Sequence, residues 1–318
     1  MGAKDRIITV GLCPAWDICC RGRALDWGLH KEIDQQVIRP AGKAMNISHA
    51  LAWMGQRNVA AGLWGQDDHE QVLRRMRPLR ELVETKLTAV AGQTRRNITV
   101  VDSADGREMH LRSKSALASA KSLRKLGADL DRLVRRHSVC VFAGAMPAGP
   151  LLAEIVRIVE LCSCRGASIV VDTHGPALKA IVETGLARLV CPNVEELSQL
   201  LGVQVRDTPV GLASLGRRLL ARTEGVLISR GPKGAMLVTK DGAWRGRCAV
   251  RRKTLSTVGC GDYLLAGFLK GLQGKSDLAV ALRTAVKAAT ARAWGWTETK
   301  TWLQMERRIN VDVARLTF

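Results

Sequence analysis

The sequence is short of aromatic residues, which make up 4% of the chain and include one tyrosine and three phenylalanines. Proteins that bind single-stranded nucleic acids interleave basic side chains with aromatic rings on which the bases stack. Basic residues are abundant, with 49 lysines and arginines against 29 acidic residues and a net charge of +20. Because the aromatic partners are scarce, we expect this charge to lie on solvated helix faces, and we do not expect nucleic acid as a partner.

Long apolar runs are also missing. No stretch reaches the roughly 18 uninterrupted apolar residues of a membrane helix, and the N-terminus has no apolar core of a signal peptide. The nine cysteines form no CxxC pair, and the six histidines are not spaced as metal ligands. We therefore expect free thiols in a reducing cytoplasm, no membrane partner and no structural metal site.

The chain does contain alternating strand and helix patterns, and its 47% of apolar residues is enough to fill a core. Buried, β-branched runs predict strands, and residues with helical spacing follow them. Such alternation predicts an α/β fold with a mostly parallel central sheet and helices on both faces. The predicted strands cover residues 6–11, 58–63, 138–143, 168–172, 189–191, 225–229, 235–239 and 243–250. The predicted helices cover residues 46–54, 68–77, 151–162, 177–183, 194–201, 262–272 and 278–294.

A second pattern interrupts this alternation. Residues 96–102 (RNITVVD) alternate as a β-strand, and Asp105-Gly106 is a turn signal after which residues 107–112 return as a hairpin partner. We predict one domain over residues 1–318, with a small β-rich lid made from segments at about 13–40 and 89–112. Ligands of such folds bind at the carboxyl ends of the parallel strands.

The segment with the strongest chemical signal is TVGCGD, residues 257–262, which precedes an apolar helix. Gly259 and Gly261 allow a sharp turn that exposes backbone N–H groups, and the helix start adds free donors and a positive dipole end. Together with Cys260 they form a predicted anion hole for a phosphate in transfer. The carboxylate of Asp262 at the same place is a candidate general base, although an aspartate there is also a favoured N-cap.

Eight segments in chain order resemble the ribokinase-like (PfkB) carbohydrate kinases, most of all the branch of 1-phosphofructokinase and tagatose-6-phosphate kinase. The last of them in the chain is STVGCGDYLLAGF at residues 256–268. The other segments are residues 13–17 (CPAWD), 40–46 (PAGKAMN), 94–97 (TRRN), 144–149 (GAMPAG), 171–178 (VDTHGPAL), 192–197 (PNVEEL) and 229–234 (SRGPKG). The resemblance covers nearly the whole chain and implies a three-layer α/β/α sandwich with a small β-sheet lid.

The resemblance also implies roles for single residues. It implies transfer of the γ-phosphate of ATP, with magnesium, to a hydroxyl of fructose 1-phosphate, fructose 6-phosphate or tagatose 6-phosphate, with Asp262 as the base. The residues implied to bind the sugar are Asp17, Gly42, Lys43, Asn46 and, for its phosphate, Arg95. The residues implied to serve the nucleotide are Asn193, Glu196, Ser229, Gly231 and Gly234, the first two also holding magnesium through water. Lids of this family often pair, so we expect a homodimer.

Several positions depart from the family pattern. Ala41 replaces a glycine of the sugar signature, Ala145 replaces a serine, and Cys191 replaces a lysine before Pro-Asn. Two other functions therefore stay open: a kinase of an unphosphorylated sugar or nucleoside, and a non-catalytic protein that binds a sugar phosphate or nucleic acid. Cys260 stands where alanine is usual, and a thiol at a helix N-terminus in a basic site is expected to have a lowered pKa and to be reactive.

Overall fold

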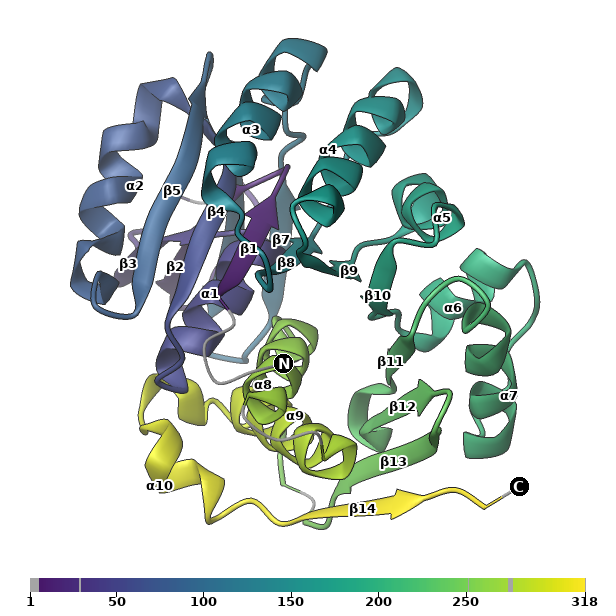
Figure 1. Cartoon of the computed structure of the whole chain (residues 1–318). Helices are drawn as coiled ribbons and strands as arrows, with labels where there is room; N and C mark the ends of the chain where they lie inside the picture. The colour runs from purple at the N-terminus through teal and green to yellow at the C-terminus, as the bar shows by residue number, and fades with distance from the viewer. Residues whose placement is uncertain (1–5, 29, 251, 274–276, 318) are drawn as a thin grey trace.

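The central sheet dominates the computed structural model in Figure 1, which describes residues 6–28, 30–250, 252–273 and 277–317. Among these residues, ten strands form one sheet in the order β14-β13-β12-β11-β10-β9-β8-β1-β4-β5. Seven of the strands are mutually parallel: β1 (Ile7–Gly11), β4 (Asn58–Gly65), β5 (Val83–Val90), β8 (Val139–Ala143), β9 (Ser168–Asp172), β10 (Ala187–Val190) and β11 (Gly225–Ser229). Three more extend the β11 edge in antiparallel pairing: β12 (Ala235–Thr239), β13 (Gly242–Cys248) and β14 (Val311–Arg315).

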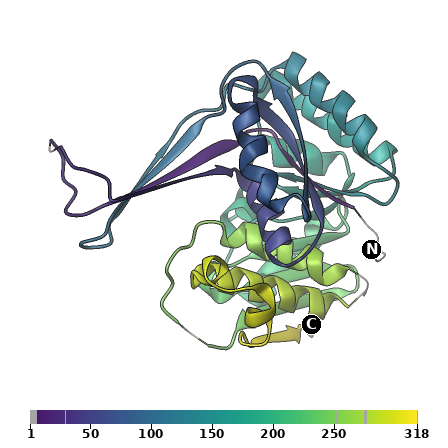
Figure 2. The ribbon, with the colours of Figure 1, turned by 90° about the vertical axis from the view of Figure 1, so that its left-hand side faces the viewer.

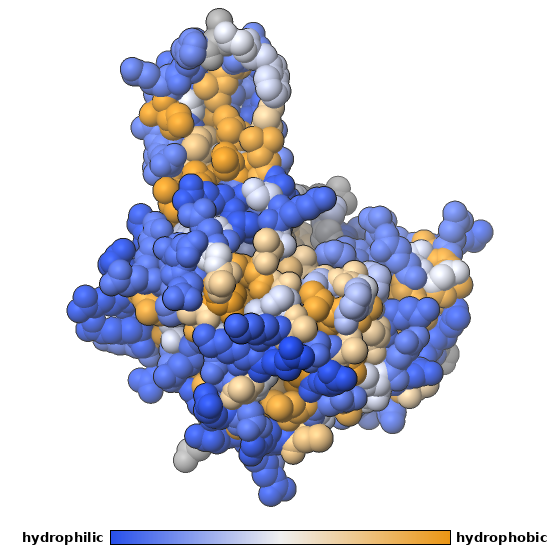
Figure 3. All heavy atoms as spheres, turned by 90° about the horizontal axis from the view of Figure 1, so that it is seen from above, coloured by the Kyte–Doolittle hydropathy of each residue, from blue (hydrophilic) through white to orange (hydrophobic). Residues whose placement is uncertain are grey.

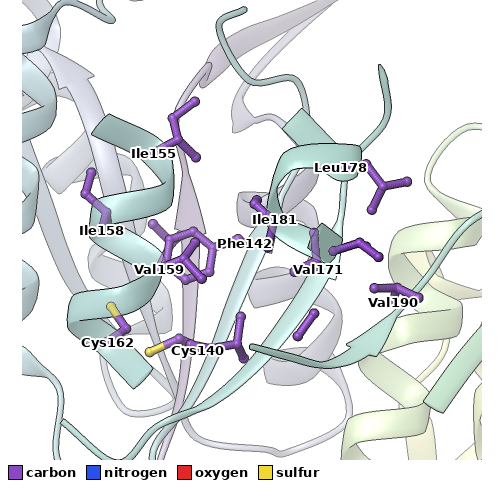
Figure 4. Packing of buried hydrophobic residues seen from close by; sticks show 14 of the residues in the cluster. Cys140, Phe142, Ile155, Ile158, Val159, Cys162, Val171, Leu178, Ile181 and Val190 are labelled. Carbon is purple, nitrogen blue, oxygen red and sulfur yellow. The ribbon is translucent and has the colours of Figure 1, made fainter. Parts of the chain in front are cut away.

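Helices cover both faces of this sheet, because alternate residues of each buried strand point to opposite sides. In β8, Cys140 and Phe142 pack against one helical layer, and Val139 and Val141 pack against the other. Figure 4 shows the first of these cores, where β8 and its neighbours meet the apolar sides of two helices. The result is the expected three-layer arrangement.

The helices of the first layer contribute to the core around Phe142 and are α3 (Ala120–Leu133), α4 (Leu152–Cys164), α5 (Gly175–Glu183), α6 (Val194–Leu201) and α7 (Pro209–Leu219). Those of the second layer are α1 (Lys43–Trp53), α2 (His69–Met76), α8 (Cys260–Leu272), α9 (Leu278–Ala293) and α10 (Trp302–Glu306). No helix in the described part of the chain is long and apolar enough to cross a membrane.

Helices α8 and α9 approach each other unusually closely. A Cβ on Gly267 would lie 2.8 Å from the Cα of Ala285, and one on Gly271 would lie 2.6 Å from the Cα of Ala281. Both distances are shorter than atoms tolerate, so only glycine permits this contact at either position. The close packing fixes where the C-terminal end of α9 lies relative to the first turn of α8.

A smaller sheet projects from the main body, as Figure 2 shows. Its strands, in the order β3-β2-β6-β7, are β2 (Ala15–Gly22), β3 (Gln35–Ala41), β6 (Arg96–Asp102) and β7 (Glu108–Arg112). The carboxylate of Asp102 accepts hydrogen bonds from the backbone N–H groups of Ala24 and Leu25, which ties the β2–β3 connection to β6. The second segment of this sheet begins at Arg96 and not near residue 89, because residues 83–90 form β5 in the central sheet.

Most of the predicted elements are present, and their ends lie within two or three residues of the expected positions. The elements β5, α3, α7 and β14 were not predicted, because their patterns in the sequence are weak. Strand β5 carries charged residues on its exposed positions, which breaks the apolar run. Helices α3 and α7 and strand β14 likewise mix charge with apolar residues. Ser119 nevertheless caps α3, with a reciprocal hydrogen bond from its backbone N–H to Ser122. The predicted strand 243–250 ends at Cys248.

Candidate active site

The carboxyl ends of the central parallel strands meet at one edge of the large sheet, and the helices that begin there carry most of the predicted site residues. Asp172 ends β9 and Ser229 ends β11. Lys43 begins α1, Asn193 caps α6 and Gly259 is the N-cap of α8. This edge therefore gathers strand ends and helix N-termini, where backbone N–H groups without intrahelical partners can face an anion.

Asp262 lies in the first turn of α8 and is only 5% exposed. It is not the N-cap, because Gly259 occupies that position with a left-handed backbone at φ 79° and makes no side-chain cap. The Nδ2 of Asn46, on α1, donates a hydrogen bond of 2.8 Å to Oδ2 of Asp262. Two residues that the sequence places 216 positions apart are thus in direct contact.

The electrostatic surroundings of Asp262 bring its pKa close to neutral pH. Burial raises the pKa of Asp262 to about 7, and the charge of Asp172 contributes to the rise. Lys43, the hydrogen bond from Asn46 and Arg292 act in the opposite direction. A carboxyl with such a pKa is ionised for a large part of the time at pH 7, yet remains basic enough to accept a proton.

Lys43 is held by an ion pair within the site. Its Nζ lies 2.8 Å from Oδ1 of Asp172, whose side chain is almost completely buried. Although burial alone lowers the pKa of Lys43, the attraction of Asp172, with smaller contributions from Asp262 and Glu196, raises it above its usual value. The ammonium group therefore stays charged. Asp172 was not among the predicted site residues, although a carboxylate at the end of a buried strand is the sequence signal for such a role.

The turn before α1 has little room for a side chain. Gly42 has φ 105°, and a Cβ there would lie 3.3 Å from the Cα of Pro14. Ala41, which replaces a glycine of the sugar signature, is buried at the end of β3 opposite Ala15. Gly42 brings the start of α1 against residues 13–15, so that the two N-terminal segments of the predicted site are in contact.

Cys260 is the first residue of α8, and the expectation of a low pKa for its thiol is wrong. Burial raises the pKa of Cys260, the charge of Asp262 adds to the rise, and Arg292 opposes it. Its Sγ also contacts the carbonyl oxygen of Ser256 at 3.6 Å. The helix start and the basic surroundings do not compensate for the loss of hydration, so the thiol is expected to be slow to react.

Asn193 and Glu196 form a capping box at the start of α6. The Oδ1 of Asn193 accepts from the backbone N–H of Glu196 at 2.8 Å, and Oε2 of Glu196 accepts from the backbone N–H of Asn193 at 2.9 Å. Ser229 lies beside them, since its N–H donates to the carbonyl of Pro192 at 3.1 Å. Cys191 precedes this box, and burial raises its pKa well above the usual value, so it is a neutral thiol.

The short turn after β11, residues 230–234, is held by two ion pairs to Asp207. Nε of Arg230 lies 2.7 Å from Oδ1 of Asp207, and Nζ of Lys233 lies 2.6 Å from Oδ2 of the same carboxylate. Gly231 has φ 54° with open space around its Cα, while a Cβ on Gly234 would lie 2.1 Å from the carbonyl oxygen of Gly246. Gly234 is therefore required by the contact between β12 and β13, whatever else it does.

Asp17 lies on β2 of the small sheet and Arg95 directly precedes β6, and neither forms a hydrogen bond with Asp262 in the described part of the chain. Oδ1 of Asp17 accepts from Nδ2 of Asn97 at 2.9 Å, across the pair β2 and β6. The guanidinium of Arg95 donates to three backbone carbonyls, those of Cys13, Pro14 and Ser113, at 3.1 to 3.2 Å. One N–H on each terminal nitrogen is left over from these contacts.

Two pockets lie near the ends of the central strands. One is small and lies beside the predicted sugar site, where Cys13, Pro14, Gly42 and Lys43 contribute to its wall. A larger cavity of about 570 Å³ lies at the amino ends of β1, β4 and β5 and is lined by Arg6, Arg57, Arg80, Glu81 and Glu84 among others. It lies at the opposite end of the strands from Asp262, and an ion pair between Arg6 and Glu84 already neutralises part of its charge.

Comparison with known proteins identifies the family and the fold of the chain. The family model described as "pfkB family carbohydrate kinase" matches residues 6–293. The chain belongs to the pfkB family of carbohydrate kinases. It is therefore a phosphotransferase with an alcohol group as acceptor. The ribokinase-like α/β fold with its mostly parallel sheet, expected from the sequence, is confirmed.

Individual relatives cover the same length. The chain is 26% identical over 283 residues to the 1-phosphofructokinase of Vibrio cholerae, covering 88% of this chain and 87% of that protein. It is 26% identical over 289 residues to the 1-phosphofructokinase of Bacillus subtilis, covering 91% and 92%. Among solved structures, phosphofructokinase-2 from Escherichia coli in complex with potassium superposes with a TM-score of 0.88 at 22% identity, covering 96% and 98%. The two 1-phosphofructokinases support the 1-phosphofructokinase branch of the pfkB kinases, and the solved structure shows the fold.

The pfkB kinase fold thus brings together Asp262, Asn46 and Lys43 from the prediction, and adds Asp172 and Arg292. Arg292 lies in the last turn of α9 and acts electrostatically on both Asp262 and Cys260. In sequence it is an ordinary basic residue in the last turn of an amphipathic helix. Only the packing of α9 on α8 places it beside the turn at Gly259.

The titration of Asp262 gives a prediction that needs no substrate. Its pKa rises from 3.8 to about 7 on folding, so its protonation stabilises the fold below pH 4 and this stabilisation is lost as the pH rises through about 7. We expect the unfolding free energy of Asp262→Asn, minus that of the parent, to increase by up to about 4 kcal/mol over this window and then to level off. Urea unfolding at several pH values measures the difference, and a difference that stays constant with pH would contradict the argument.

Proposed function

We propose that the protein transfers the γ-phosphate of ATP to a hydroxyl of a phosphorylated ketohexose: fructose 1-phosphate, fructose 6-phosphate or tagatose 6-phosphate. The observation that carries the proposal is the position of Asp262, a buried carboxylate with a pKa of about 7 at a helix N-terminus. The relatives named 1-phosphofructokinase support the choice of a sugar phosphate as acceptor. The membership in a carbohydrate kinase family supports the reaction class.

The proposed reaction begins when the acceptor hydroxyl gives its proton to a carboxylate oxygen of Asp262. The hydroxyl oxygen then bonds to the γ-phosphorus while the bond from that phosphorus to the β–γ bridging oxygen breaks, and ADP leaves. Negative charge spreads over the transferred phosphoryl oxygens, which the N–H groups of Gly259, Cys260 and Gly261 and the positive end of α8 stabilise. Lys43, kept charged by Asp172, supplies a further cation close by.

The residues at this edge fit a magnesium ion held mainly by phosphates and water. Magnesium usually keeps several waters and binds substrate phosphates, so a single protein carboxylate can hold one of its waters. Glu196 uses Oε2 in the capping box, so Oε1 is the oxygen we assign to a water of the metal, and Asn193 orients Glu196. Bound magnesium would neutralise charge on the nucleotide phosphates. Ser229, Gly231 and Gly234 form the turn assigned to the nucleotide.

For the acceptor we assign Asp17, Gly42, Lys43 and Asn46 to the sugar and Arg95 to the phosphate that it already carries. Arg95 is fixed by its three carbonyl contacts, so its two remaining N–H groups are pre-oriented for a phosphate. The small sheet acts as a lid in this proposal. Closed over the sugar, it would exclude water and so suppress hydrolysis of ATP.

The first experiment measures ADP release from MgATP with a panel of sugars, sugar phosphates and nucleosides. We expect turnover with one ketohexose phosphate, and a loss of about 10²–10⁴ in kcat for Asp262→Asn, because the acceptor then has no base. The parent rate should rise with pH and level off above about pH 7, the pKa of Asp262. The control is Asp241→Asn, which removes a carboxylate from the exposed turn between β12 and β13. Full activity of Asp262→Asn, or no turnover on the panel, would refute the proposal.

The second experiment tests whether the acceptor is phosphorylated. Arg95→Gln removes a charge-assisted contact, so we expect its KM for the phosphorylated sugar to rise about 10- to 100-fold, with much less change for the unphosphorylated sugar. Arg96→Gln is the matched control, since it changes the neighbouring exposed arginine at the start of β6. Equal losses for both sugars would assign Arg95 to the lid structure alone and favour an unphosphorylated acceptor.

We also propose that two copies pair through their lids. On one face of the small sheet, Ile38, Ile18, Ile98 and Leu111 stand in cross-strand register, with Val100 and Met109 beside them. Figure 3 shows apolar surface gathered on this projecting sheet, and half of Leu111 is exposed. Asp17 and Asn97 lie on the opposite face, which leaves the apolar face free for an identical patch of a second copy.

A single charge at this face tests the pairing. We expect the parent to sediment as a dimer and Ile98→Glu to sediment as a monomer, because the variant would bury an unpaired carboxylate. Thr99→Glu, which places the same charge on the other face of β6, should remain a dimer. A monomeric parent, or a dimeric Ile98→Glu, would show that the lids do not pair through this surface.

A further inference from the structure

Arg292 contacts the turn that precedes α8. Its Nε donates a hydrogen bond of 3.0 Å to the carbonyl oxygen of Val258, the residue before Gly259. A Cβ on Gly259 would lie 3.4 Å from this Nε and 3.8 Å from Oδ2 of Asp262. The guanidinium and the carboxylate are thus both within 4 Å of one point beside Gly259. The guanidinium also lies over the ring of Tyr263, 5.8 Å from its centre.

Other contacts fix the orientation of this guanidinium. Nη1 of Arg292 is 3.2 Å from Oε1 of Glu298 and 3.5 Å from Oγ1 of Thr297, so nitrogens at two sides of the plane are engaged. The side chain is 20% exposed, much less than that of Glu298 at 53%. The base of the side chain is fixed as well, because glycines on α8 hold α9 at contact distance. Because Nη1 of the planar guanidinium is held by Glu298 and Thr297, its Nε–H is directed at the carbonyl of Val258.

The carboxylate of Glu298, which contacts Arg292, also lies close to the small sheet. Oε1 of Glu298 lies 3.7 Å from Nη2 of Arg39, on β3, and both side chains are about half exposed. Such an exposed pair is weak and is easily broken and remade. Glu298 therefore connects a residue of the small sheet with the arginine that holds the turn before Asp262.

We propose that Arg292 is a positioning residue for phosphoryl transfer: by holding the carbonyl of Val258 it sets the turn whose N–H groups receive the phosphoryl oxygens, and Glu298 orients it. This rests on the function proposed above. A turn with a left-handed glycine has other backbone conformations within reach, so a donor that holds one peptide selects the conformation that faces the phosphate. The preorganised turn then needs no rearrangement when charge develops on the phosphoryl group.

The charge of Arg292 also acts on the groups of this turn. It lowers the pKa values of Asp262 and Cys260, in each case against the stronger effect of burial. The other groups that face Asp262 are Asp172 from β9 and Lys43 and Asn46 from α1. None of them is altered by a substitution at Arg292, so a shift in the pH dependence would report on Arg292 itself.

The test compares Arg292→Met, Arg292→Lys and Arg292→Ala with the parent. We expect kcat of Arg292→Met to fall about 10- to 100-fold with little change in KM for the sugar, because the turn acts on the transition state. The acidic limb of its pH profile should move to higher pH. Arg292→Lys should be intermediate, since one ammonium cannot engage Val258 and Glu298 in the same geometry. Millimolar guanidinium should restore part of the activity of Arg292→Ala, which leaves a space of that shape.

Arg283→Met is the matched control, because it removes an arginine from the same helix nine residues before Arg292, about 13 Å along the axis. It should keep the parent rate and pH profile. Circular dichroism and melting temperature of each variant separate misfolding from loss of function, and Arg292→Lys keeps the test available if the methionine variant does not fold.

A second measurement does not depend on turnover. Alkylation of Cys260 by iodoacetamide, followed by mass spectrometry of its peptide, should be about two- to tenfold slower in Arg292→Met than in the parent or Arg283→Met, because the thiol loses a cation that favours its thiolate. If the parent turns over no acceptor, the proposed function fails, and this comparison still decides whether Arg292 acts on the turn.

Two results would overturn the inference. The first is an Arg292→Met variant with the parent kcat, pH profile and Cys260 alkylation rate. The second is a variant that loses activity together with stability, with no shift of the pH profile and no rescue by guanidinium, since this would show a packing role only.

Discussion

Two buried carboxylates lie within each other's electrostatic field, and much of the site is arranged around their repulsion. Burial raises the pKa of Asp262, and the charge of Asp172 raises it further. Left alone, such a pair would hold a proton through most of the neutral range and neither carboxylate would be an effective base. The cations Lys43 and Arg292 lower the pKa of Asp262, one from the start of α1 and the other from the last turn of α9.

The topology of the fold brings these two carboxylates and two cations together. The end of β9 presents Asp172, and the neighbouring strands leave room for α1 to bring Lys43 and Asn46 to the same edge. Because parallel strands all end on one side, groups far apart in the chain meet there without long side chains or long loops. The small sheet is the exception, since its Asp17 bonds to Asn97 of the same sheet and not to the groups around Asp262.

The sequence was informative where a pattern is local. Buried β-branched runs gave most strands, and the paired glycines before an apolar helix correctly placed the start of α8 next to Asp262. Contacts between distant segments could not be predicted from the sequence. Lys43 and Asp172, for example, are 129 positions apart, and nothing in either segment indicates the other. The reactivity expected of Cys260 failed for a related reason. Helix dipoles and neighbouring charges can be read from sequence, whereas burial, which dominates its pKa, depends on tertiary packing.

The scarcity of acidic residues has a structural consequence of its own. With 29 carboxylates for 49 basic residues, single carboxylates serve two cations at several places. Glu154 pairs with Arg124 and Arg157, and Asp207 pairs with Arg230 and Lys233. In these cases the shared carboxylate joins parts of one surface. At Glu298 the same arrangement joins the small sheet to the turn before Asp262, so movement of one partner changes the electrostatic attraction available to the other. A surplus of cations thereby places one surface carboxylate between an arginine of the small sheet and the arginine that contacts the turn before α8.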